Sequence, residues 1–312
     1  MANTVIQTTL DEIKKMKEHY QAFLSEKSPP GSVFFARKDG CVITAYKSGK
    51  VMFQGNSNEE EASKWGSPAE KKPKASATAT GKTSGMPLPD NISTLSVIGS
   101  DEVGKGDYFG PLTVVAAYVK SEQIPLLREL GVKDSKHLTD SQIINIAKDL
   151  LTFLPYSLLK LDNPKYNQLQ ASGMTQGKMT AILHNQAHNN LLEKISPEKP
   201  DAILVDQFAQ APIYYKHLQG QKQIQREKIY FSTKAESIHL AVAAASILAR
   251  YAFVRAFDQL SKKAGFTIPK GAGAKVDQAA ARLIKERGVP ALNEFTKLHF
   301  ANTGKAKKIA RV

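Results

Sequence analysis

Cysteine is almost absent from this sequence: Cys41 is the single one among 312 residues. One thiol cannot form a disulfide within the chain, which excludes a disulfide-stabilised fold and favours a reducing, cytoplasmic environment. The sequence starts without a basic segment followed by an apolar one, so we expect no secretory signal peptide. Because no apolar run approaches the ~18–20 residues of a membrane span, we also expect no membrane partner.

Acidic residues are scarce relative to basic ones. The chain has 29 Asp and Glu against 43 Lys and Arg, which gives a formal net charge of +14. A surplus of this size favours a polyanionic partner, of which nucleic acid is the commonest. The alternative is a generally basic protein without such a partner. Hydrophobic residues make up 42% of the chain, which is enough for a substantial core.

The first 60 residues have the pattern of a small α+β domain. Apolar residues at helical spacing predict a helix over 8–27, with Thr9 and Glu12 as a capping box at its start. Three β-type runs follow, separated by turn-forming residues, at 32–37, 41–46 and 51–55. Residues 56–90 have little apolar periodicity and predict mainly a flexible linker, except that Trp65 is expected to pack back on the small domain.

From residue 95 onward, β-type runs alternate with helical stretches. The runs lie at 95–100, 111–119, 202–208 and 228–232, and the helical stretches at 139–152, 175–194, 237–260 and 276–287. This alternation predicts an α/β fold in which helices cover a mixed sheet. We therefore expect a small domain over 1–66, a linker over 67–92 and a larger domain over 93–312.

Acidic residues end two strands that are otherwise apolar. Asp101 and Glu102 follow one buried-type run, and Asp206 follows another. Glu236 lies on the small, apolar face of the long helical stretch, near its start. Carboxylates that converge at strand ends need a cation to offset their burial and repulsion, and hard oxygen ligands select Mg²⁺ or Mn²⁺. The alternative is that each acid merely caps a helix or turn.

The turn after Asp101 and Glu102 is rich in glycine. Residues 99–105 spell G-x-x-x-x-G-K, but Gly106 stands where a phosphate-binding loop requires Ser or Thr. Two acids inside the loop would repel phosphates, and a β-type run follows instead of a helix. We therefore expect no nucleotide cofactor. The glycines instead allow a sugar-phosphate strand to approach the backbone closely, and a ribose 2′-hydroxyl can both donate and accept hydrogen bonds there.

These motifs together resemble those of the type 2 ribonuclease H family over roughly 95–260. The segment VIGSDEVGKGDYFGPLTVVAAYV resembles the family's first motif, and KAESIHLAVAAASILAR resembles its last. Between them lie a D-S-K motif and the strand ILVDQF. The G-K-G turn, Glu236 as the fourth carboxylate and the added N-terminal domain resemble the ribonuclease HIII branch, whose N-terminal domain has a TATA-binding-protein-like fold. The C-terminal KLHFANTGKA also resembles this branch.

The resemblance implies a ribonuclease H-like mixed sheet and an endonuclease that hydrolyses the RNA strand of RNA/DNA hybrids to 5′-phosphate and 3′-hydroxyl ends by two-metal-ion catalysis. Position by position, it implies that Asp101, Glu102, Asp206 and Glu236 bind the metal and catalyse. It further implies that Gly104, Lys105 and Gly106 sense ribose 2′-hydroxyls and that Ser135 and Lys136 contact substrate. We interpret His184, His188 and His239 as structural, with proton transfer by His239 as an alternative.

The small N-terminal domain is expected to add affinity for the hybrid, because aromatic residues alternate there with the basic residues Arg37, Lys38, Lys47 and Lys50. An ordinary solvated hairpin edge is the alternative. Two other functions stay open: a nucleic-acid-binding protein with an inactive site, and a type 2 enzyme specialised for single embedded ribonucleotides. Nothing in the sequence demands an assembly larger than a monomer.

Overall fold

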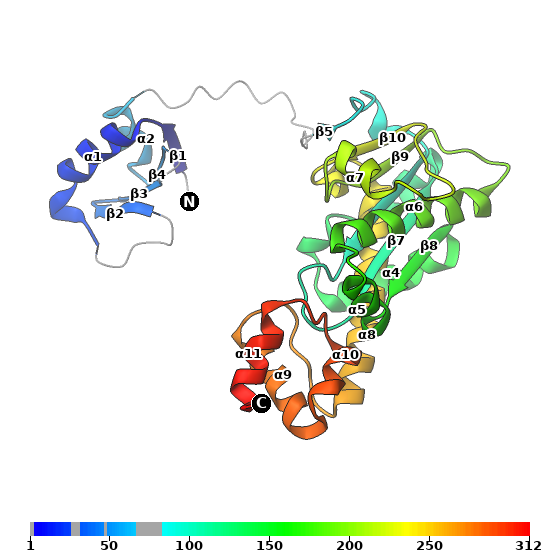
Figure 1. Cartoon of the computed structure of the whole chain (residues 1–312). Helices are drawn as coiled ribbons and strands as arrows, with labels where there is room; N and C mark the ends of the chain where they lie inside the picture. Colours follow the sequence, from blue (N-terminus) through cyan, green and yellow to red (C-terminus); the bar gives the residue numbers. More distant parts are fainter. Residues whose placement is uncertain (1–2, 26–31, 47–48, 67–82) are drawn as a thin grey trace. The chain divides into compact units, whose positions relative to one another are not determined.

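The computed structural model describes residues 3–25, 32–46, 49–66 and 83–312. The chain forms two compact units, Met1–Ala77 and Thr78–Val312, which are coloured blue and cyan to red in Figure 1. Each unit has its own buried core. The predicted linker over 67–92 includes the short strand β5 (Thr83–Ser84) and the first residue of the turn η2 (Ile92–Thr94). Both elements belong to the second unit, which therefore begins before residue 93.

The first unit is an antiparallel sheet with helices on one face. Its strand order is β1-β4-β3-β2. Ile13 and Met16 of the first helix pack with Ile43 and Phe53 of the sheet, so the predicted small α+β domain is confirmed. The elements are β1 (Asn3–Gln7), α1 (Leu10–His19), η1 (Gln21–Phe23), β2 (Ser32–Lys38), β3 (Cys41–Tyr46), β4 (Lys50–Gly55) and α2 (Asn58–Ser63).

Two details of this unit differ from the prediction. The helix expected over 8–27 is capped by Thr9 as predicted, but α1 ends at His19. The chain turns there because Tyr20 is fully buried and bonds to Glu61 of α2 at 2.9 Å. Strand β1 was not predicted, since only pairing with β4 reveals that its short run belongs to the sheet. Trp65 packs on this core and donates to the Tyr20 hydroxyl at 2.8 Å, as predicted.

The second unit is built on a six-stranded mixed sheet in the order β5-β10-β9-β6-β7-β8. Strands β6, β9 and β10 run parallel, whereas β7, β8 and β5 pair antiparallel with their neighbours. This confirms the predicted mixed sheet flanked by helices. The strand β8 was not predicted because its sequence lacks apolar alternation. Bounds are β6 (Val97–Val103), β7 (Leu112–Val119), β8 (Tyr156–Leu161), β9 (Ala202–Asp206) and β10 (Ile229–Ser232).

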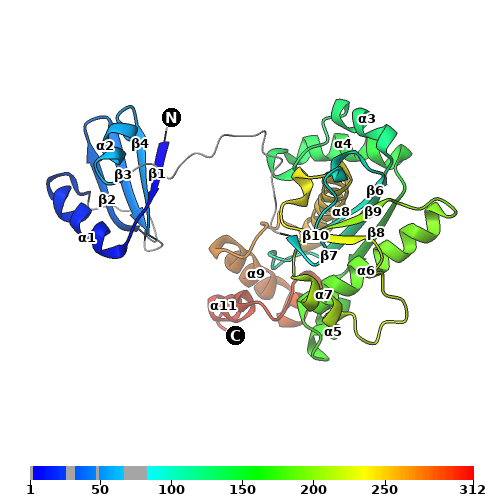
Figure 2. The same ribbon diagram turned by 90° about the horizontal axis from the view of Figure 1, so that it is seen from above.

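Helices cover both faces of this sheet (Figure 2). Successive side chains of a strand point to opposite faces, so Val97 and Val115 pack under α8 and α4, whereas Ile98 and Val114 pack under α6 and α7. The helical elements are η3 (Ser121–Gln123), α3 (Ile124–Glu129), η4 (Ser135–His137), α4 (Asp140–Phe153), α5 (Asn163–Ala171), α6 (Gln176–Ile195), α7 (Ala211–His217), η5 (Ala235–Ser237) and α8 (Leu240–Ala264).

The start of α8 lies directly against β6. A Cβ atom at Gly99 would come within 2.2 Å of the backbone at Ala241 and Val242, so only glycine permits this approach. Although no long apolar run was expected, α8 is long and apolar enough to cross a membrane by length and composition. However, 72% of its most apolar window is buried within the second unit. It is therefore the central core helix of that unit.

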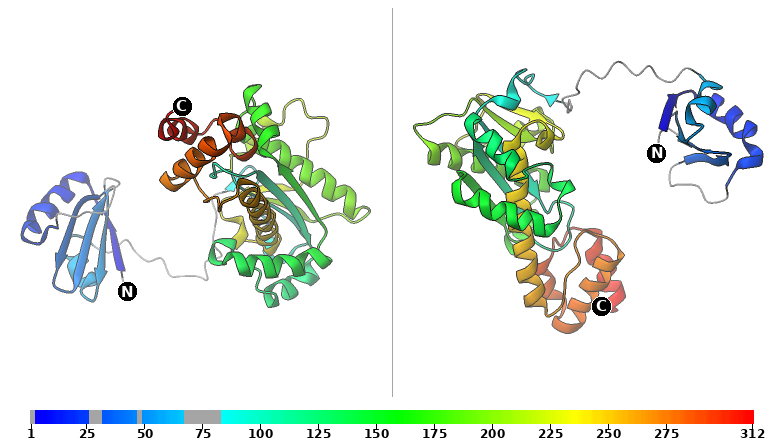
Figure 3. Two further views of the ribbon diagram at one scale, coloured as in Figure 1. Left: turned by 90° about the horizontal axis from the view of Figure 1, so that it is seen from below. Right: turned by 180° about the vertical axis from the view of Figure 1, so that it is seen from behind.

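A cluster of C-terminal helices packs around the C-terminal half of α8 (Figure 3). Its core joins Phe253 and Phe257 of α8 to Tyr108 and Phe109, which follow the Gly-Lys-Gly turn. The predicted helix over 276–287 is confirmed, and the basic C-terminal tail is helical. The elements are α9 (Ala274–Arg287), η6 (Val289–Ala291), α10 (Leu292–Phe295) and α11 (Ala301–Ala310).

Candidate active site

Three of the four predicted acids converge at the ends of the parallel strands. Asp101 lies on β6, Asp206 ends β9 and Glu236 lies in η5. Ser100 pairs with Val205 in the parallel register, so the next residues of the two strands, Asp101 and Asp206, are neighbours. One carboxylate oxygen from each of the three acids lies within 4.8 Å of the others. The structure thus brings together residues separated by up to 135 positions.

The position of Glu236 is set by the turn before α8. The prediction placed it on the first turn of the long helix, but α8 begins only at Leu240, and Glu236 lies in the preceding 3₁₀ turn. Asp206 Oδ1 accepts from the backbone N–H of Ala235 at 2.9 Å, which ties this turn to β9. His239 caps α8 through Nδ1 and contacts the Leu95 carbonyl through Nε2. Its proposed role in proton transfer finds no support in this arrangement.

Burial and mutual repulsion oppose ionisation of this cluster. Burial raises the pKa of the Asp101 carboxyl well above its usual value, and the charges of Glu102 and Asp206 raise it further. Burial likewise raises the pKa of Asp206, against the hydrogen bond from Ala235. A divalent cation would remove both penalties. Because the donors are all carboxylate oxygens, they fit Mg²⁺ or Mn²⁺ rather than a metal that prefers nitrogen or sulfur.

Glu102, the fourth predicted acid, is outside the group of three. Its Oε2 lies 3.0 Å from Nε2 of His184 on α6. Its Oε1 lies 3.1 Å from Nζ of Lys105. Glu102 is still close enough that its charge raises the pKa of Asp101 and Asp206. Both of its oxygens are therefore engaged by side chains at the margin of the cluster.

The Gly-Lys-Gly turn is shaped by its first glycine. Gly104 has φ +99°, and a Cβ there would lie 2.2 Å from the Pro111 carbonyl oxygen. Nζ of Lys105 lies 4.8 Å from the centre of the Phe208 ring. The backbone carbonyl of Lys105 accepts a hydrogen bond from the Gln176 side chain at 3.1 Å. Gly106 has open space on the side where a Cβ would stand. The turn is thus held rigid while Gly106 stays accessible.

The two glycines of the turn therefore differ in what they tolerate. We expect Gly104→Ala to lower the free energy of unfolding by about 1–3 kcal/mol, because alanine is strained at this φ and meets the Pro111 carbonyl. Gly106→Ala should change it by no more than about 0.5 kcal/mol. Urea denaturation of the two variants and the wild type measures both values. Equal stability of the two variants would contradict the structural role given to Gly104.

Ser135 and Lys136 contact the carboxylate of Glu236. The Ser135 backbone N–H donates to Oε2 at 2.9 Å, and Lys136 Nζ lies 3.2 Å from Oε1. The Ser135 hydroxyl pairs with Ser246 at 2.9 Å, and Arg250 donates to the Ser135 carbonyl at 2.6 Å. The Lys136 side chain is 70% exposed, so it is accessible to a substrate. Ser135 is buried and orients Glu236 from the protein interior.

Arg250 and Lys297 support the site, although neither was predicted from the sequence. Arg250 also binds Asp140 at 2.7 Å, and it lies at helical spacing from Ser246. Lys297 is fully buried and donates to the carbonyls of Asp107 at 2.8 Å and Gly110 at 2.5 Å. Burial lowers the pKa of Lys297 to about 7. A lysine in an aromatic C-terminal segment gives no sign in the sequence that it anchors the loop after the Gly-Lys-Gly turn.

The structure separates the basic residues predicted in the first unit. Arg37 and Lys50 are exposed and alternate with the buried positions, so they lie on the sheet face without helices. Arg37 lies over the Phe35 ring on that face, 5.4 Å from its centre. Lys38 points to the helical face instead and pairs with the buried Glu61 at 2.9 Å. Lys47 lies outside the described residues.

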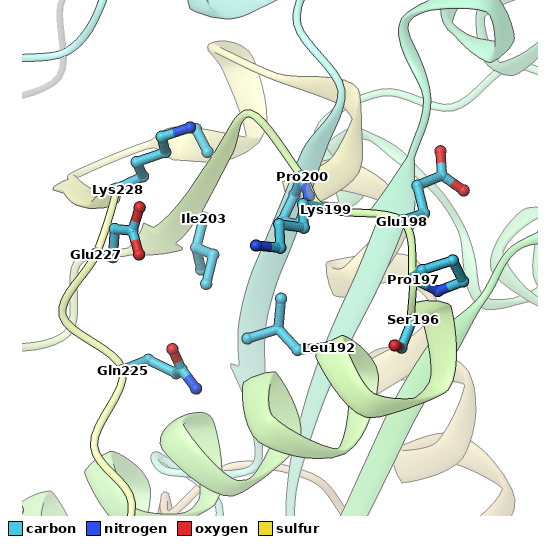
Figure 4. Close-up of a pocket in the computed structure, with 11 residues that line it drawn as sticks. Leu192, Ser196, Pro197, Glu198, Lys199, Pro200, Ile203, Gln225, Glu227 and Lys228 are labelled. Carbon is cyan, nitrogen blue, oxygen red and sulfur yellow. The ribbon is translucent and has the colours of Figure 1, made fainter.

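The pocket in Figure 4 is separate from the carboxylates. It has a volume of about 280 Å³ and is lined by residues that include Leu192, Lys199, Ile203 and Gln225. Ala202 and Ile203 begin β9, whereas Asp206 ends the same strand. The pocket therefore lies toward the opposite end of the sheet from the acidic cluster.

The second unit matches the family model of ribonuclease HII over residues 98–303, and the first matches a domain of unknown function over residues 3–78. The chain belongs to the ribonuclease HII family. Its full-length relatives include ribonuclease HIII of Bacillus mycoides, 57% identical over 100% of both chains, and ribonuclease HIII of Bacillus pumilus, 58% identical over 99% of both. The predicted resemblance to the ribonuclease HIII branch is thereby confirmed.

Solved structures agree with this assignment. The crystal structure of Bst-RNase HIII in complex with Mn²⁺ matches with a TM-score of 0.71 and 45% identity, covering 99% of both chains. The ribonuclease H2 of Pyrococcus horikoshii matches 70% of this chain with a TM-score of 0.56 and 24% identity, which concerns the fold alone. The predicted ribonuclease H-like fold is confirmed.

Proposed function

We propose that this protein is an endonuclease that hydrolyses the RNA strand of RNA/DNA hybrids at a divalent-cation site formed by Asp101, Asp206 and Glu236, with Glu102 at its margin. The products are a 5′-phosphate and a 3′-hydroxyl. The observation that carries the proposal is the approach of three carboxylates within 4.8 Å at the ends of parallel strands. The family to which the chain belongs, and the Mn²⁺ in the related Bst-RNase HIII, support it.

Bound Mg²⁺ or Mn²⁺ ions supply the activation of a water molecule and the stabilisation of the leaving 3′-oxygen. The side chains do the rest. Strands β6 and β9 fix the positions of Asp101 and Asp206. The backbone N–H of Ser135 donates to Glu236 and fixes its carboxylate. Lys136, largely exposed beside Glu236, is placed to contact a phosphate of the substrate strand.

The Gly104-Lys105-Gly106 turn begins just after β6 ends at Val103, two residues beyond Glu102. A ribose bound at this turn should therefore lie close to the carboxylates. The exposed backbone at Gly106 can approach a ribose closely. A 2′-hydroxyl both donates and accepts, and backbone amide and carbonyl groups supply the complementary partners. We propose that this turn selects the RNA strand.

A labelled hybrid tests the function directly. We expect cleavage with Mg²⁺ or Mn²⁺, none with EDTA, and no cleavage of DNA duplex of the same sequence. Ligation of the products should reveal 5′-phosphate ends. Absence of metal-dependent products would favour a binding protein with an inactive site. Efficient cutting at a single ribonucleotide within a DNA duplex, with poor cutting of a long hybrid, would favour an enzyme specialised for embedded ribonucleotides.

We further propose that the small domain predicted over 1–66, which lies within the first unit, binds the hybrid through its open sheet face, which no helix of the described residues covers. That face carries Arg37, Lys50 and the ring of Phe35, which suits contact with a phosphate backbone and sugars. Lys38 is engaged by Glu61 and belongs to the fold of the unit. Of the predicted 67–92 linker, only the part before β5 (Thr83–Ser84) is proposed to connect the two units, because β5 and Ile92 belong to the second unit. Action as a monomer in the cytoplasm completes the proposal.

Charge reversal on the open face tests this binding role. We expect Arg37→Glu with Lys50→Glu to raise the Kd for a hybrid about 10-fold or more at low salt, and to reduce the salt dependence of log Kd by a slope of about 2. The control is Lys14→Glu with Lys15→Glu on α1, which makes the same charge change on the helical face. Equal weakening by both double variants would show a general effect of net charge and remove the open face from the account.

A further inference from the structure

Glu102 is connected to the interior of the second unit by a chain of three buried polar side chains. His184 Nε2 lies 3.0 Å from Oε2 of Glu102, and His184 Nδ1 lies 3.0 Å from the Ser100 hydroxyl. The same hydroxyl lies 2.8 Å from Nε2 of His188, one turn further along α6. Ser100, His184 and His188 have no solvent exposure. Burying three polar groups is costly unless each finds a partner.

The chain has a defined direction. Burial and the neighbouring His184 lower the pKa of His188 to about 3, so His188 is neutral. Its Nδ1 has no hydrogen-bond partner among the residues that the structure describes, which places its single proton on Nε2, donating to Ser100. With His188 donating, the Ser100 hydroxyl can donate to Nδ1 of His184, and a His184 ring with one proton then carries it on Nε2 and donates to Glu102. An ionised carboxylate can only accept, which agrees with this order.

The ring of His184 is also fixed sterically. It stacks on Phe208, with ring centres 5.1 Å apart and an angle of 22° between the planes. Phe208 follows Asp206, the last residue of β9, by two residues. The segment that leaves this strand therefore carries the ring that packs against His184. The second oxygen of Glu102 is held differently, by Lys105, whose side chain is 30% exposed. Oε2 of Glu102 is therefore anchored by the buried His184, whereas Oε1 contacts the partly exposed Lys105, which a cation could replace.

We propose that His184 is a positioning residue of the reaction: its Nε2–H anchors Oε2 of Glu102, so that Oε1 is presented to a divalent cation held by Asp101 and Asp206. This rests on the proposed function, because it assigns Glu102 to the same cation site. Lys105 holds Oε1 until a cation replaces it. A histidine that bonds a ligand carboxylate sets the orientation of that ligand, and loss of such a contact costs about 10–100-fold in metal affinity or activity.

Three substitutions that keep a polar side chain separate this role from packing. His184→Asn retains an amide at the position that contacts Ser100 but is too short to reach Glu102. His184→Gln places an amide nitrogen near the position of Nε2 and restores that contact. His188→Gln is the control, because His188 is equally buried and bonds to the same hydroxyl but does not touch Glu102.

The measurement is the binding of Mn²⁺ alone, by electron paramagnetic resonance, together with kcat and KM on a labelled hybrid. We expect His184→Asn to raise the Kd for Mn²⁺, and the Mn²⁺ concentration for half-maximal cleavage, by about 10–100-fold. The KM for hybrid at saturating Mn²⁺ should stay within about 2-fold, because His184 does not face the substrate. His184→Gln and His188→Gln should both bind Mn²⁺ within about 3-fold of the wild type, which is below the loss expected when such a contact is removed.

Wild-type Mn²⁺ affinity in His184→Asn would overturn the proposal, as would equal losses in His184→Asn and His188→Gln. A His184→Gln variant as impaired as His184→Asn would do the same. If the variants do not fold, nitrogen NMR of histidine-labelled wild-type protein decides, because the proposal requires a proton on Nε2 of His184. A wild-type protein that neither binds Mn²⁺ nor cleaves the hybrid would instead contradict the proposed function itself.

Discussion

Cleavage of an RNA/DNA hybrid should fall by at least about 1,000-fold when Asp101 or Asp206 is replaced by asparagine, a loss of about 4 kcal/mol of transition-state stabilisation. Asparagine keeps the shape of the side chain and one oxygen. It removes the negative charge, and the three-carboxylate cluster then attracts a divalent cation less strongly. Single-turnover cleavage at saturating protein and Mg²⁺ measures the loss in the chemical step.

Hybrid binding should survive these substitutions. The affinity measured in EDTA is expected to stay within about 2-fold of the wild type, because phosphate contacts supply most of the binding energy. Asp149→Asn is a matched control, since Asp149 is an exposed acid of α4 and is not part of the cluster. Normal turnover in Asp101→Asn or Asp206→Asn would refute the assignment of the metal site. Loss of binding together with cleavage would point to misfolding.

The metal-free protein should be destabilised by its own active site as the pH rises. The pKa of the buried Asp101 is well above that of an unfolded aspartate, and the pKa of Asp206 is raised in the same direction. Between the unfolded pKa, about 3.9, and the raised folded pKa, the folded state binds more protons than the unfolded state. The contribution of Asp101 to the free energy of unfolding is therefore fully present below about pH 4 and is lost as the pH rises through its folded pKa.

Asp101→Asn removes this term and isolates it from the other titrations. In EDTA, we expect the variant to have the higher Tm at neutral pH, by roughly 2–4 °C for each kcal/mol relieved in a domain of this size. The advantage should shrink toward pH 4. Saturating Mn²⁺ should reverse the order, because only the wild type binds the ion tightly and gains stability from it. A difference in Tm that is independent of both pH and Mn²⁺ would contradict this account.

The acids at the strand ends were predicted from local sequence pattern alone. Asp101 and Asp206 each follow an apolar run, and this contrast alone marked them as unusual. The alternation of strands and helices likewise predicted the mixed sheet. The resemblance to type 2 ribonucleases H then implied a role for each acid, and the relatives confirm the family but do not test those roles. Strand β8 and strand β1 were missed because edge strands are half-exposed and acquire their identity from pairing.

The position of Glu236 shows where local pattern fails. Helical spacing predicted that it shares a face with Leu240 and Ala243, but a 3₁₀ turn fixed by Asp206 precedes the helix. A turn held by a residue 29 positions earlier has no signature in its own sequence. Alternation along β2 does require the consecutive residues Arg37 and Lys38 to point to opposite faces, but only the packing of the helices decides which of those faces is covered.

The sequence by itself therefore determined the kind of residues at the site: carboxylates at the ends of apolar strands, a glycine-rich turn beside them and a strongly basic chain. Tertiary structure alone decided that three acids meet while Glu102 turns to His184, 82 residues away. The reason is physical. Residue type and periodicity are local properties of the chain, whereas the distance between two oxygens depends on strand register and on how helices dock against the sheet.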